Sequence, residues 1–184
     1  MRITGGKYRS RTVYCPPGEI RPAKDRMRTS LFSILGPLDG LSFLDLFSGS
    51  GLVGIEAASR GASVVDLVEK DFGKKAVIHR NLAWVEEPIH LHLTDVRVFL
   101  KRVAGPWDII YADPPFPMAG KLEVLQLVEQ RALLAPGGSL LLHYPGEESF
   151  PETIGGLVRY DHREYGRSQV VFYTQKVQES HASP

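Results

Sequence analysis

The architecture of this 184-residue chain follows from the stretch Phe43-Leu44-Asp45-Leu46-Phe47-Ser48-Gly49-Ser50-Gly51-Leu52-Val53-Gly54. Its apolar beginning is typical of a strand buried in a parallel sheet, and its end is typical of the start of a helix. The spacing Gly49-x-Gly51-x-x-Gly54 allows a tight turn and the close approach of a ligand to backbone N–H groups. Several nucleotide cofactors use such loops, and a strand–helix turn without a ligand fits equally, so the spacing alone leaves the function open.

Strand and helix patterns alternate from this stretch onward. Apolar, largely unalternated runs predict strands at 42–47, 64–69, 89–94, 107–112 and 138–144. Helical patterns lie between or after these strands, at 52–60, 72–84, 96–103 and 120–134. Two β-prone runs, 157–165 and 169–174, then flank Gly166-Arg167 and predict a hairpin. The chain is therefore expected to adopt an α/β fold, a Rossmann-like, doubly wound, seven-stranded and mostly parallel sheet with a C-terminal antiparallel hairpin.

The N-terminal part of the chain is strongly basic. The net charge of the whole chain is +1, yet residues 1–28 carry eight basic side chains and only two acidic ones. Residues 2–15 alternate loosely around Gly5-Gly6, which predicts a small hairpin. We expect a basic β-hairpin arm at 1–20, the main domain at 21–176 and a flexible tail at 177–184. A basic arm indicates a polyanionic partner, and a merely solvated tail is the alternative.

Composition excludes several classes of protein. No apolar run approaches the roughly 20 residues of a membrane span, and the first residues lack the apolar core of a signal peptide. Cys15 is the only cysteine, so no intrachain disulfide or Cys-rich metal site can form. The histidines show no ligand spacing, and no metal is predicted. We expect a cytoplasmic protein without membrane contact.

Two acids help to choose the cofactor. Asp45 lies four residues before Gly49, where a carboxylate would repel a pyrophosphate but can hold an ammonium group. S-adenosylmethionine carries an ammonium group and no phosphate, so Asp45 favours it over NAD. Glu69 follows Gly49 by 20 residues at the end of the second strand, where a carboxylate can accept hydrogen bonds from both ribose hydroxyls of either cofactor.

A third acid, Asp95, ends the third predicted strand. It lies at the carboxyl edge of the sheet and could accept a hydrogen bond from an adenine amino group. It also directly precedes the helix predicted at 96–103, so a helix N-cap is the competing role. The two roles are compatible with each other.

The stretch Asp113-Pro114-Pro115-Phe116 follows the apolar strand predicted at 107–112. Proline fixes φ, and the residue before a proline is held extended. The Asp113 carboxylate and the Pro114 carbonyl are therefore fixed outward as acceptors, and Phe116 adds a flat apolar face. Two acceptors beside a flat face suit a planar substrate that carries an amino group, such as a nucleobase.

These elements resemble the class I S-adenosylmethionine-dependent methyltransferases that modify exocyclic amino groups, whose signature is Asn/Asp-Pro-Pro-aromatic. More narrowly, the chain resembles the bacterial methyltransferases that act on guanine N2 of small-subunit (16S) ribosomal RNA, from Arg2 to about Thr174. The segments that carry this narrower resemblance are Ile3-Thr4-Gly5-Gly6-Lys7-Tyr8-Arg9-Ser10-Arg11, Arg21-Pro22-Ala23-Lys24-Asp25-Arg26-Met27-Arg28, Leu44-Asp45-Leu46-Phe47-Ser48-Gly49-Ser50-Gly51, Gly54-Ile55-Glu56-Ala57-Ala58-Ser59-Arg60-Gly61-Ala62 and Tyr165-Gly166.

The chain departs from this family at several positions. Family members often have Thr where Ala23 stands and Glu where Thr29 stands. Many have Tyr where Phe116 stands; Phe keeps the stacking face and loses a hydroxyl. After the fifth strand, where an acid is common, this chain has His143-Tyr144.

The resemblance implies a monomeric enzyme that transfers a methyl group from S-adenosylmethionine to guanine N2 of ribosomal RNA, within a small-subunit assembly particle. The implied catalytic residues are Asp113, Pro114, Pro115 and Phe116. The implied cofactor-binding residues are Asp45, Phe47, Ser48, Gly49, Ser50, Gly51, Glu69, Lys70, Asp95 and Val96. The residues expected to contact RNA are Arg2, Lys7, Arg9, Arg11 and Arg21.

Three other functions stay open on the sequence. The first is methylation of adenine N6 or of another exocyclic amine in DNA or RNA, because the Asp113 motif alone does not exclude it. The second is a non-catalytic RNA-binding or assembly protein on the same fold, which the intact motif disfavours. The third is an NAD dehydrogenase, which Asp45 disfavours.

Overall fold

The computed structural model describes residues 1–15 and 22–176, and side-chain positions in the second range from Asp25 onward. The tail predicted at 177–184, the end of the predicted arm and Arg21 lie outside these residues. Among the described residues, no helix is both long enough and apolar enough to cross a membrane.

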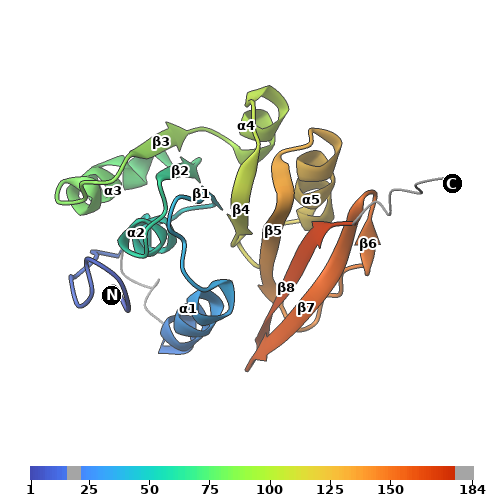
Figure 1. Ribbon diagram of the computed structural model, residues 1–184, viewed down its shortest axis with the longest axis horizontal. Helices are drawn as coiled ribbons and strands as arrows, with labels where there is room; N and C mark the ends of the chain where they lie inside the picture. Colours follow the sequence, from blue (N-terminus) through green and yellow to red (C-terminus); the bar gives the residue numbers. More distant parts are fainter. Residues whose placement is uncertain (16–21, 177–184) are drawn as a thin grey trace, which may run out of the picture.

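One eight-stranded sheet forms the centre of the molecule (Figure 1), in the order β3-β2-β1-β4-β5-β8-β7-β6. The first five of these strands are parallel neighbours, and β8, β7 and β6 continue the sheet in antiparallel pairing. The strands are β1 (Ser42–Leu46), β2 (Val64–Glu69), β3 (Ile89–Leu93), β4 (Trp107–Ala112), β5 (Leu134–Pro145), β6 (Thr153–Ile154), β7 (Leu157–Tyr165) and β8 (Ser168–Gln175).

Helices cover both faces of this sheet. They are α1 (Pro22–Leu35), α2 (Leu52–Ser59), α3 (Lys75–Leu82), α4 (Val96–Arg102) and α5 (Lys121–Gln130), with a 3₁₀ turn, η1 (Phe72–Lys74), before α3. Alternate strand residues enter two separate cores, because successive side chains of a strand point to opposite faces. In β4, Ile110 packs with α4 and α5, whereas Ile109 and Tyr111 pack with α1, α2 and α3. The predicted doubly wound α/β fold is confirmed.

The sheet has eight strands where seven were predicted. The additional strand, β6, has only two residues and pairs with β7 around Gly155-Gly156, so it is too short for a periodicity signal. In addition, β5 begins at Leu134, before the predicted start at residue 138, and α5 ends at Gln130. The pairing of β5 with β4 has a register irregularity between Trp107 and Ile109, and β5 includes Pro136 and Gly137, which lie between the helix predicted at 120–134 and the strand predicted at 138–144.

The N-terminal segment is a loop packed on the body of the molecule. Arg2 and Thr12 form a single antiparallel bridge, where a hairpin was predicted. Ile3, Tyr8 and Val13 are buried in a small core with side chains of α2. Sequence alternation could not reveal this packing, because it depends on the neighbouring helix.

Glu56 of α2 ties this segment to the domain. Its carboxylate is fully buried and accepts hydrogen bonds from the backbone N–H groups of Thr4 and Gly5, at 2.8 and 2.9 Å. It also pairs with Arg60 at 2.9 Å and with the buried Arg28 of α1 at 3.3 Å. One carboxylate therefore joins the N-terminal loop, α1 and α2.

We expect Glu56→Ala to destabilise the fold by about 3–5 kcal/mol, because it removes a buried carboxylate partner of the Arg28 guanidinium and the acceptor of the Thr4 and Gly5 N–H groups. Arg28 keeps its ion pair with Asp25 at 3.0 Å. Urea unfolding monitored by circular dichroism measures this loss. Glu123→Ala is the matched control, since Glu123 pairs with Arg97 at the surface and its removal should cost at most about 1 kcal/mol. Equal losses in the two variants would contradict the proposed role of Glu56.

Candidate active site

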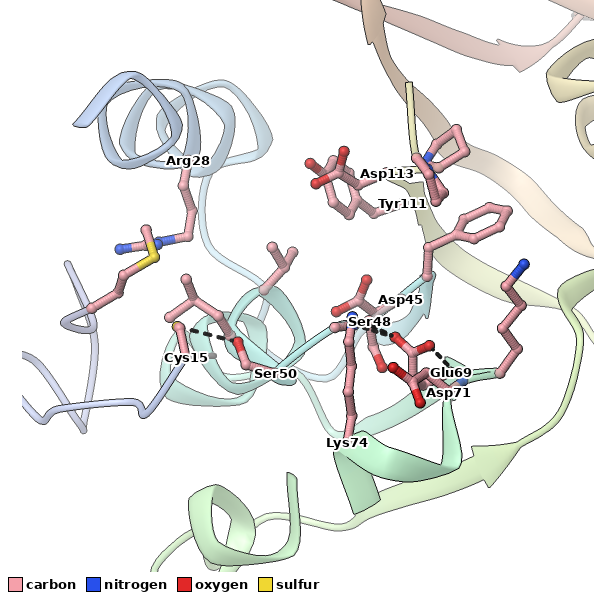
Figure 2. Close-up of a pocket in the computed structure, with 18 of the residues that line it drawn as sticks. Cys15, Arg28, Asp45, Ser48, Ser50, Glu69, Asp71, Lys74, Tyr111 and Asp113 are labelled. Carbon is pink, nitrogen blue, oxygen red and sulfur yellow. Dashed lines mark hydrogen bonds and ion pairs between the residues drawn. The ribbon is translucent and has the colours of Figure 1, made fainter. Parts of the chain in front are cut away.

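The strand order reverses between β1 and β4, which both lie in the middle of the parallel part of the sheet. Ligands of open α/β sheets bind at such a reversal, outside the carboxyl ends of the strands. A cavity of about 530 Å³ opens there. Figure 2 shows Asp45, Glu69 and Asp113 around it, each from the end of a different strand.

Most of the predicted cofactor and catalytic residues line this cavity. The predicted residues that do so are Asp45, Phe47, Ser48, Gly49, Ser50, Glu69, Lys70, Asp113, Pro114, Pro115 and Phe116. Gly51 lies in the same loop as the residue that precedes α2, and Asp95 and Val96 are not among the lining residues. The structure thus brings together residues that lie far apart in the chain, at the ends of three strands.

The loop from β1 to α2 has a backbone that only special residues adopt easily. Gly49 and Gly51 have φ angles of 57° and 79°, in the left-handed region that favours glycine. Phe47 also has a positive φ, 68°, which is strained for a residue with a side chain. A Cβ on Gly54 would lie 2.3 Å from a Leu67 methyl group, so glycine is needed there for close packing of α2 on β2.

Asp45 is a buried acid in this crevice, with 1% of its surface exposed. Its Oδ2 accepts a hydrogen bond from the Gly54 N–H at 3.1 Å. Burial raises the pKa of Asp45 well above its usual value, the Gly54 N–H opposes this rise, and the nearby carboxylates of Asp113 and Glu69 add to it. Four carboxyl groups line the cavity, those of Asp45, Glu69, Asp71 and Asp113, together with the basic side chains of Arg28, Lys70 and Lys74. The desolvated Asp45 is the acid that would gain most from a positively charged ligand group.

Glu69 is held rigidly at the end of β2. One carboxylate oxygen accepts from the Gly49 N–H at 2.9 Å and the other from the Asp71 N–H at 2.8 Å. The Lys74 ammonium lies 3.6 Å away. A carboxylate fixed beside a glycine-rich loop is suited to accept hydrogen bonds from a diol, such as the two ribose hydroxyls of a nucleoside.

The loop after β4 is fixed from both sides. The Asp113 N–H donates to the Leu46 carbonyl at 3.3 Å, which joins this loop to the end of β1. The buried ammonium of Lys121 donates to the carbonyls of Phe116 and Met118, at 2.7 and 2.9 Å, and to Glu148 at 2.6 Å. The backbone of the motif is therefore held in place by the fold.

Sequence reasoning missed several side chains of this region, and four of them bear on the motif after β4 or on its cavity. Lys121 is one of them; Arg28 and Tyr111 line the cavity, and the Tyr111 hydroxyl has no hydrogen-bond partner among the described residues. Burial, with the nearby Asp113 and Asp45 charges, raises the pKa of Tyr111 well above its usual value. The fourth is His143 at the end of β5, whose Nδ1 lies 2.7 Å from Asp113 Oδ1. A comparison of adjacent strand ends could have found His143, because β4 and β5 end side by side.

Asp95 caps α4. Its Oδ1 accepts a hydrogen bond from the Arg97 N–H at 2.8 Å, and its backbone is extended, as expected of an N-cap. The N-cap role is therefore present in the structure. Contact with an adenine amino group stays a prediction.

The residues predicted to contact RNA have different surroundings. Lys7 pairs with Glu86 and Glu87 at 2.7 and 3.0 Å, and these hydrogen bonds raise its pKa. The Arg11 guanidinium lies over the Trp84 ring at 5.1 Å. Arg2 and Arg9 are exposed, and Arg21 lies outside the described residues. In the part of the chain that the structure describes, no group of three or more side chains could hold a metal ion.

The sheet order and this crevice define a Rossmann-like fold with a ligand site, and the proteins that match it are named as methyltransferases. The solved structure of yhhF from Escherichia coli, named as a methyltransferase, matches with a TM-score of 0.87 at 29% identity, covering 97% of this chain and 99% of that one. Residues 1–174 match the model of the family described as Conserved hypothetical protein 95, and the chain belongs to this family.

Two curated relatives refine this assignment. YlbH of Bacillus subtilis (strain 168), named as an rRNA methyltransferase, is 32% identical over 184 residues, covering 96% of this chain and all of the relative. Ribosomal RNA small subunit methyltransferase D of Escherichia coli (strain K12) is 32% identical over 174 residues, covering 87% of each chain. The family resemblance predicted from the sequence is confirmed.

We expect Asp45→Asn to stabilise the ligand-free protein, and to do so increasingly as the pH rises above about 4. The wild-type carboxyl has a raised pKa in the folded state. Below the pKa that Asp45 has in the unfolded protein, its carboxyl makes its full contribution to stability. This contribution is lost as the pH rises through the higher pKa of the folded protein. The amide of the Asp45→Asn variant does not titrate, so the variant loses nothing over this range.

Urea unfolding of the two proteins, between about pH 4 and pH 8, measures this difference. Asp39→Asn, at an exposed carboxyl on the loop before β1, controls for the removal of one negative charge. A stability difference for Asp45→Asn that stays constant or shrinks over this range would contradict the electrostatic account of the crevice.

Proposed function

We propose that this chain transfers a methyl group from S-adenosylmethionine to the exocyclic N2 amine of a guanine in small-subunit ribosomal RNA. One observation carries the proposal: Asp113-Pro114-Pro115-Phe116 shares a single cavity with the buried Asp45 and the fixed Glu69. Methyl donor and planar amine can therefore be held side by side. The names of the relatives support ribosomal RNA as the substrate.

The residues of the cavity fit S-adenosylmethionine. This cofactor carries a positively charged sulfonium and an ammonium group, and it supplies an electrophilic methyl group when bound. Asp45 and its neighbouring carboxylates suit these positive charges, because a buried carboxyl gains most from a cationic partner. Glu69 would accept the ribose hydroxyls, and the loop from Phe47 to Gly51 would allow close approach of the ligand to its backbone.

The remaining residues would act on the guanine. Its N2 amine is a poor nucleophile, because the nitrogen lone pair is delocalised into the ring. Asp113 and the Pro114 carbonyl would accept the two amine hydrogens and localise the lone pair for attack on the methyl carbon. The bond between that carbon and sulfur would break in the same displacement, and its electron pair would leave with sulfur as a neutral thioether. Asp113 would accept the proton that the nitrogen loses, either directly or through water.

Phe116 would stack on the guanine ring. The base must leave its RNA neighbours to enter the cavity, and stacking on an aromatic side chain contributes about 1–3 kcal/mol per base. Because Phe116 has no hydroxyl, it can supply only this flat face. The polar contacts with the base therefore fall on Asp113 and Pro114.

We also propose that Arg2, Lys7, Arg9, Arg11 and Arg21 contact phosphates of the RNA. These residues belong to the basic N-terminal segment, which Glu56 connects to α2. Such a small basic surface suits a target that ribosomal proteins help to present, so we propose an assembly particle in the cytoplasm as the substrate and a monomer as the active form. Asp95 and Val96 would contact the adenine, and Lys70 would flank the ribose.

We expect Asp113→Ala to bind S-adenosylmethionine within a few-fold of the wild-type affinity and to lose roughly 10²–10⁴-fold in methyl transfer. Isothermal calorimetry and a labelled-methyl assay on small-subunit particles measure the two quantities. Glu69→Ala is the matched comparison, because it should affect cofactor binding, which Asp113→Ala spares. It should weaken that binding by about tenfold or more, because it removes a charged acceptor.

Full activity of Asp113→Ala would contradict the catalytic assignment. Tight binding of NAD, with no binding of S-adenosylmethionine to the wild type, would contradict the choice of cofactor.

We expect the double substitution Arg2→Ala/Arg9→Ala to weaken RNA binding and to make it less dependent on salt. The slope of log K against log [salt] should become shallower by about 0.7 for each phosphate that the variant no longer neutralises. Point substitutions are preferable to deletion, because removal of residues 1–15 would expose the core that Ile3, Tyr8 and Val13 fill. Filter binding over a range of salt concentrations measures the effect.

The matched control is Lys101→Ala/Arg102→Ala, which removes the same charge from an exposed position on α4. Cofactor binding should be unchanged in both double variants. Equal RNA affinities of the two double variants would refute a specific role for the N-terminal segment.

A further inference from the structure

His143 is a buried histidine at the end of β5, with 1% of its surface exposed. The residue before it, Leu142, pairs with Ala112 of β4, so His143 and Asp113 are the next residues along two neighbouring parallel strands. Leu141 and Tyr111, two positions earlier in each strand, belong to the core beneath α1 and α2. Because side chains alternate along a strand, His143 and Asp113 point to this same face of the sheet.

The imidazole of His143 contacts two side chains of the motif after β4, those of Asp113 and Phe116. Its Nδ1 lies 2.7 Å from Asp113 Oδ1, and its ring packs edge-to-face against Phe116 with ring centroids 5.3 Å apart. An ionised carboxylate can only accept hydrogen bonds, so Nδ1 is the donor when Asp113 is charged. The other ring nitrogen, Nε2, is buried and has no hydrogen-bond partner among the described residues.

This arrangement matters for methyl transfer because the orientation of the Asp113 carboxylate decides where its two oxygens can accept hydrogens from the substrate amine. A charge-assisted hydrogen bond of 2.7 Å is short and directional. It fixes the plane of the carboxylate, and a displacement of about 1 Å at a reacting group can cost about 10²-fold in rate. The Nδ1–H also stabilises the negative charge that the acceptor role requires.

We propose that His143 is a positioning residue for Asp113, holding the carboxylate through Nδ1 in the orientation that accepts the hydrogens of the guanine amine. The proposal rests on the proposed function and adds a residue to its machinery. His143 itself does not contact the substrate amine; it acts through Asp113. The competing explanation is that His143 only fills space against Phe116.

Two substitutions separate the hydrogen bond from the packing. His143→Asn places an amide N–H close to the position of Nδ1 and removes the ring. His143→Phe keeps a ring against Phe116 and removes the donor. His143→Leu also lacks the donor and carries the same expectation as His143→Phe, should the phenylalanine variant fail to fold.

In single-turnover and steady-state methylation of small-subunit particles, we expect His143→Phe to lose about 10–100-fold in kcat, with KM for the particle and affinity for S-adenosylmethionine little changed. His143→Asn should retain kcat within a few-fold. His162→Phe is the control, since His162 lies on β7, exposed and bonded to Gln169. It should retain wild-type kcat, and thermal unfolding confirms that each variant is folded.

Wild-type kcat in folded His143→Phe or His143→Leu would overturn the proposal, as would an equal decrease of kcat in folded His143→Asn. A variant that changes KM or cofactor affinity instead of kcat would also overturn it. These results leave the proposed function intact, because the wild-type protein still transfers methyl groups. Absence of transfer by the wild type would overturn the proposed function and this inference together.

Discussion

Parallel pairing of β1 with β4 is the constraint on which the site depends. These two strands lie next to each other in space although they are far apart in the sequence, and the chain leaves them in opposite directions across the sheet. The loops that follow these strands are connected where they begin, because the Asp113 N–H donates a hydrogen bond to the Leu46 carbonyl. The cofactor loop and the Asp-Pro-Pro-Phe loop face one cavity because of this pairing.

The buried acid Asp45 supports the choice of the proposed ligand. Burying Asp45 near Asp113 and Glu69 is unfavourable for the ligand-free protein, as the raised pKa of Asp45 indicates. A cationic ligand would relieve this cost, and a pyrophosphate would increase it. The same buried acid that weakens the isolated fold would therefore favour S-adenosylmethionine over NAD, which is a common compromise between stability and function.

The sequence was sufficient for the strands of the parallel sheet, because a buried strand is a continuous apolar run and needs no partner to be recognised. The sequence also sufficed to predict that Asp45, Glu69 and Asp113 lie close together, since the carboxyl ends of parallel strands lie at one edge of the sheet. It could not predict β6, which is stabilised only by pairing with β7, nor the packing of Tyr8 on α2. Contacts such as His143 with Asp113 depend on strand register and on rotamers, which the local pattern does not encode.

The measurement that tests the central claim most directly is nucleoside mass spectrometry of small-subunit ribosomal RNA from cells with and without this protein, with mapping of the modified position. The account predicts one N2-methylguanosine that disappears without the protein and returns when the purified protein and S-adenosylmethionine are added to particles lacking it. An unchanged content of N2-methylguanosine, or disappearance of N6-methyladenosine instead, would contradict it.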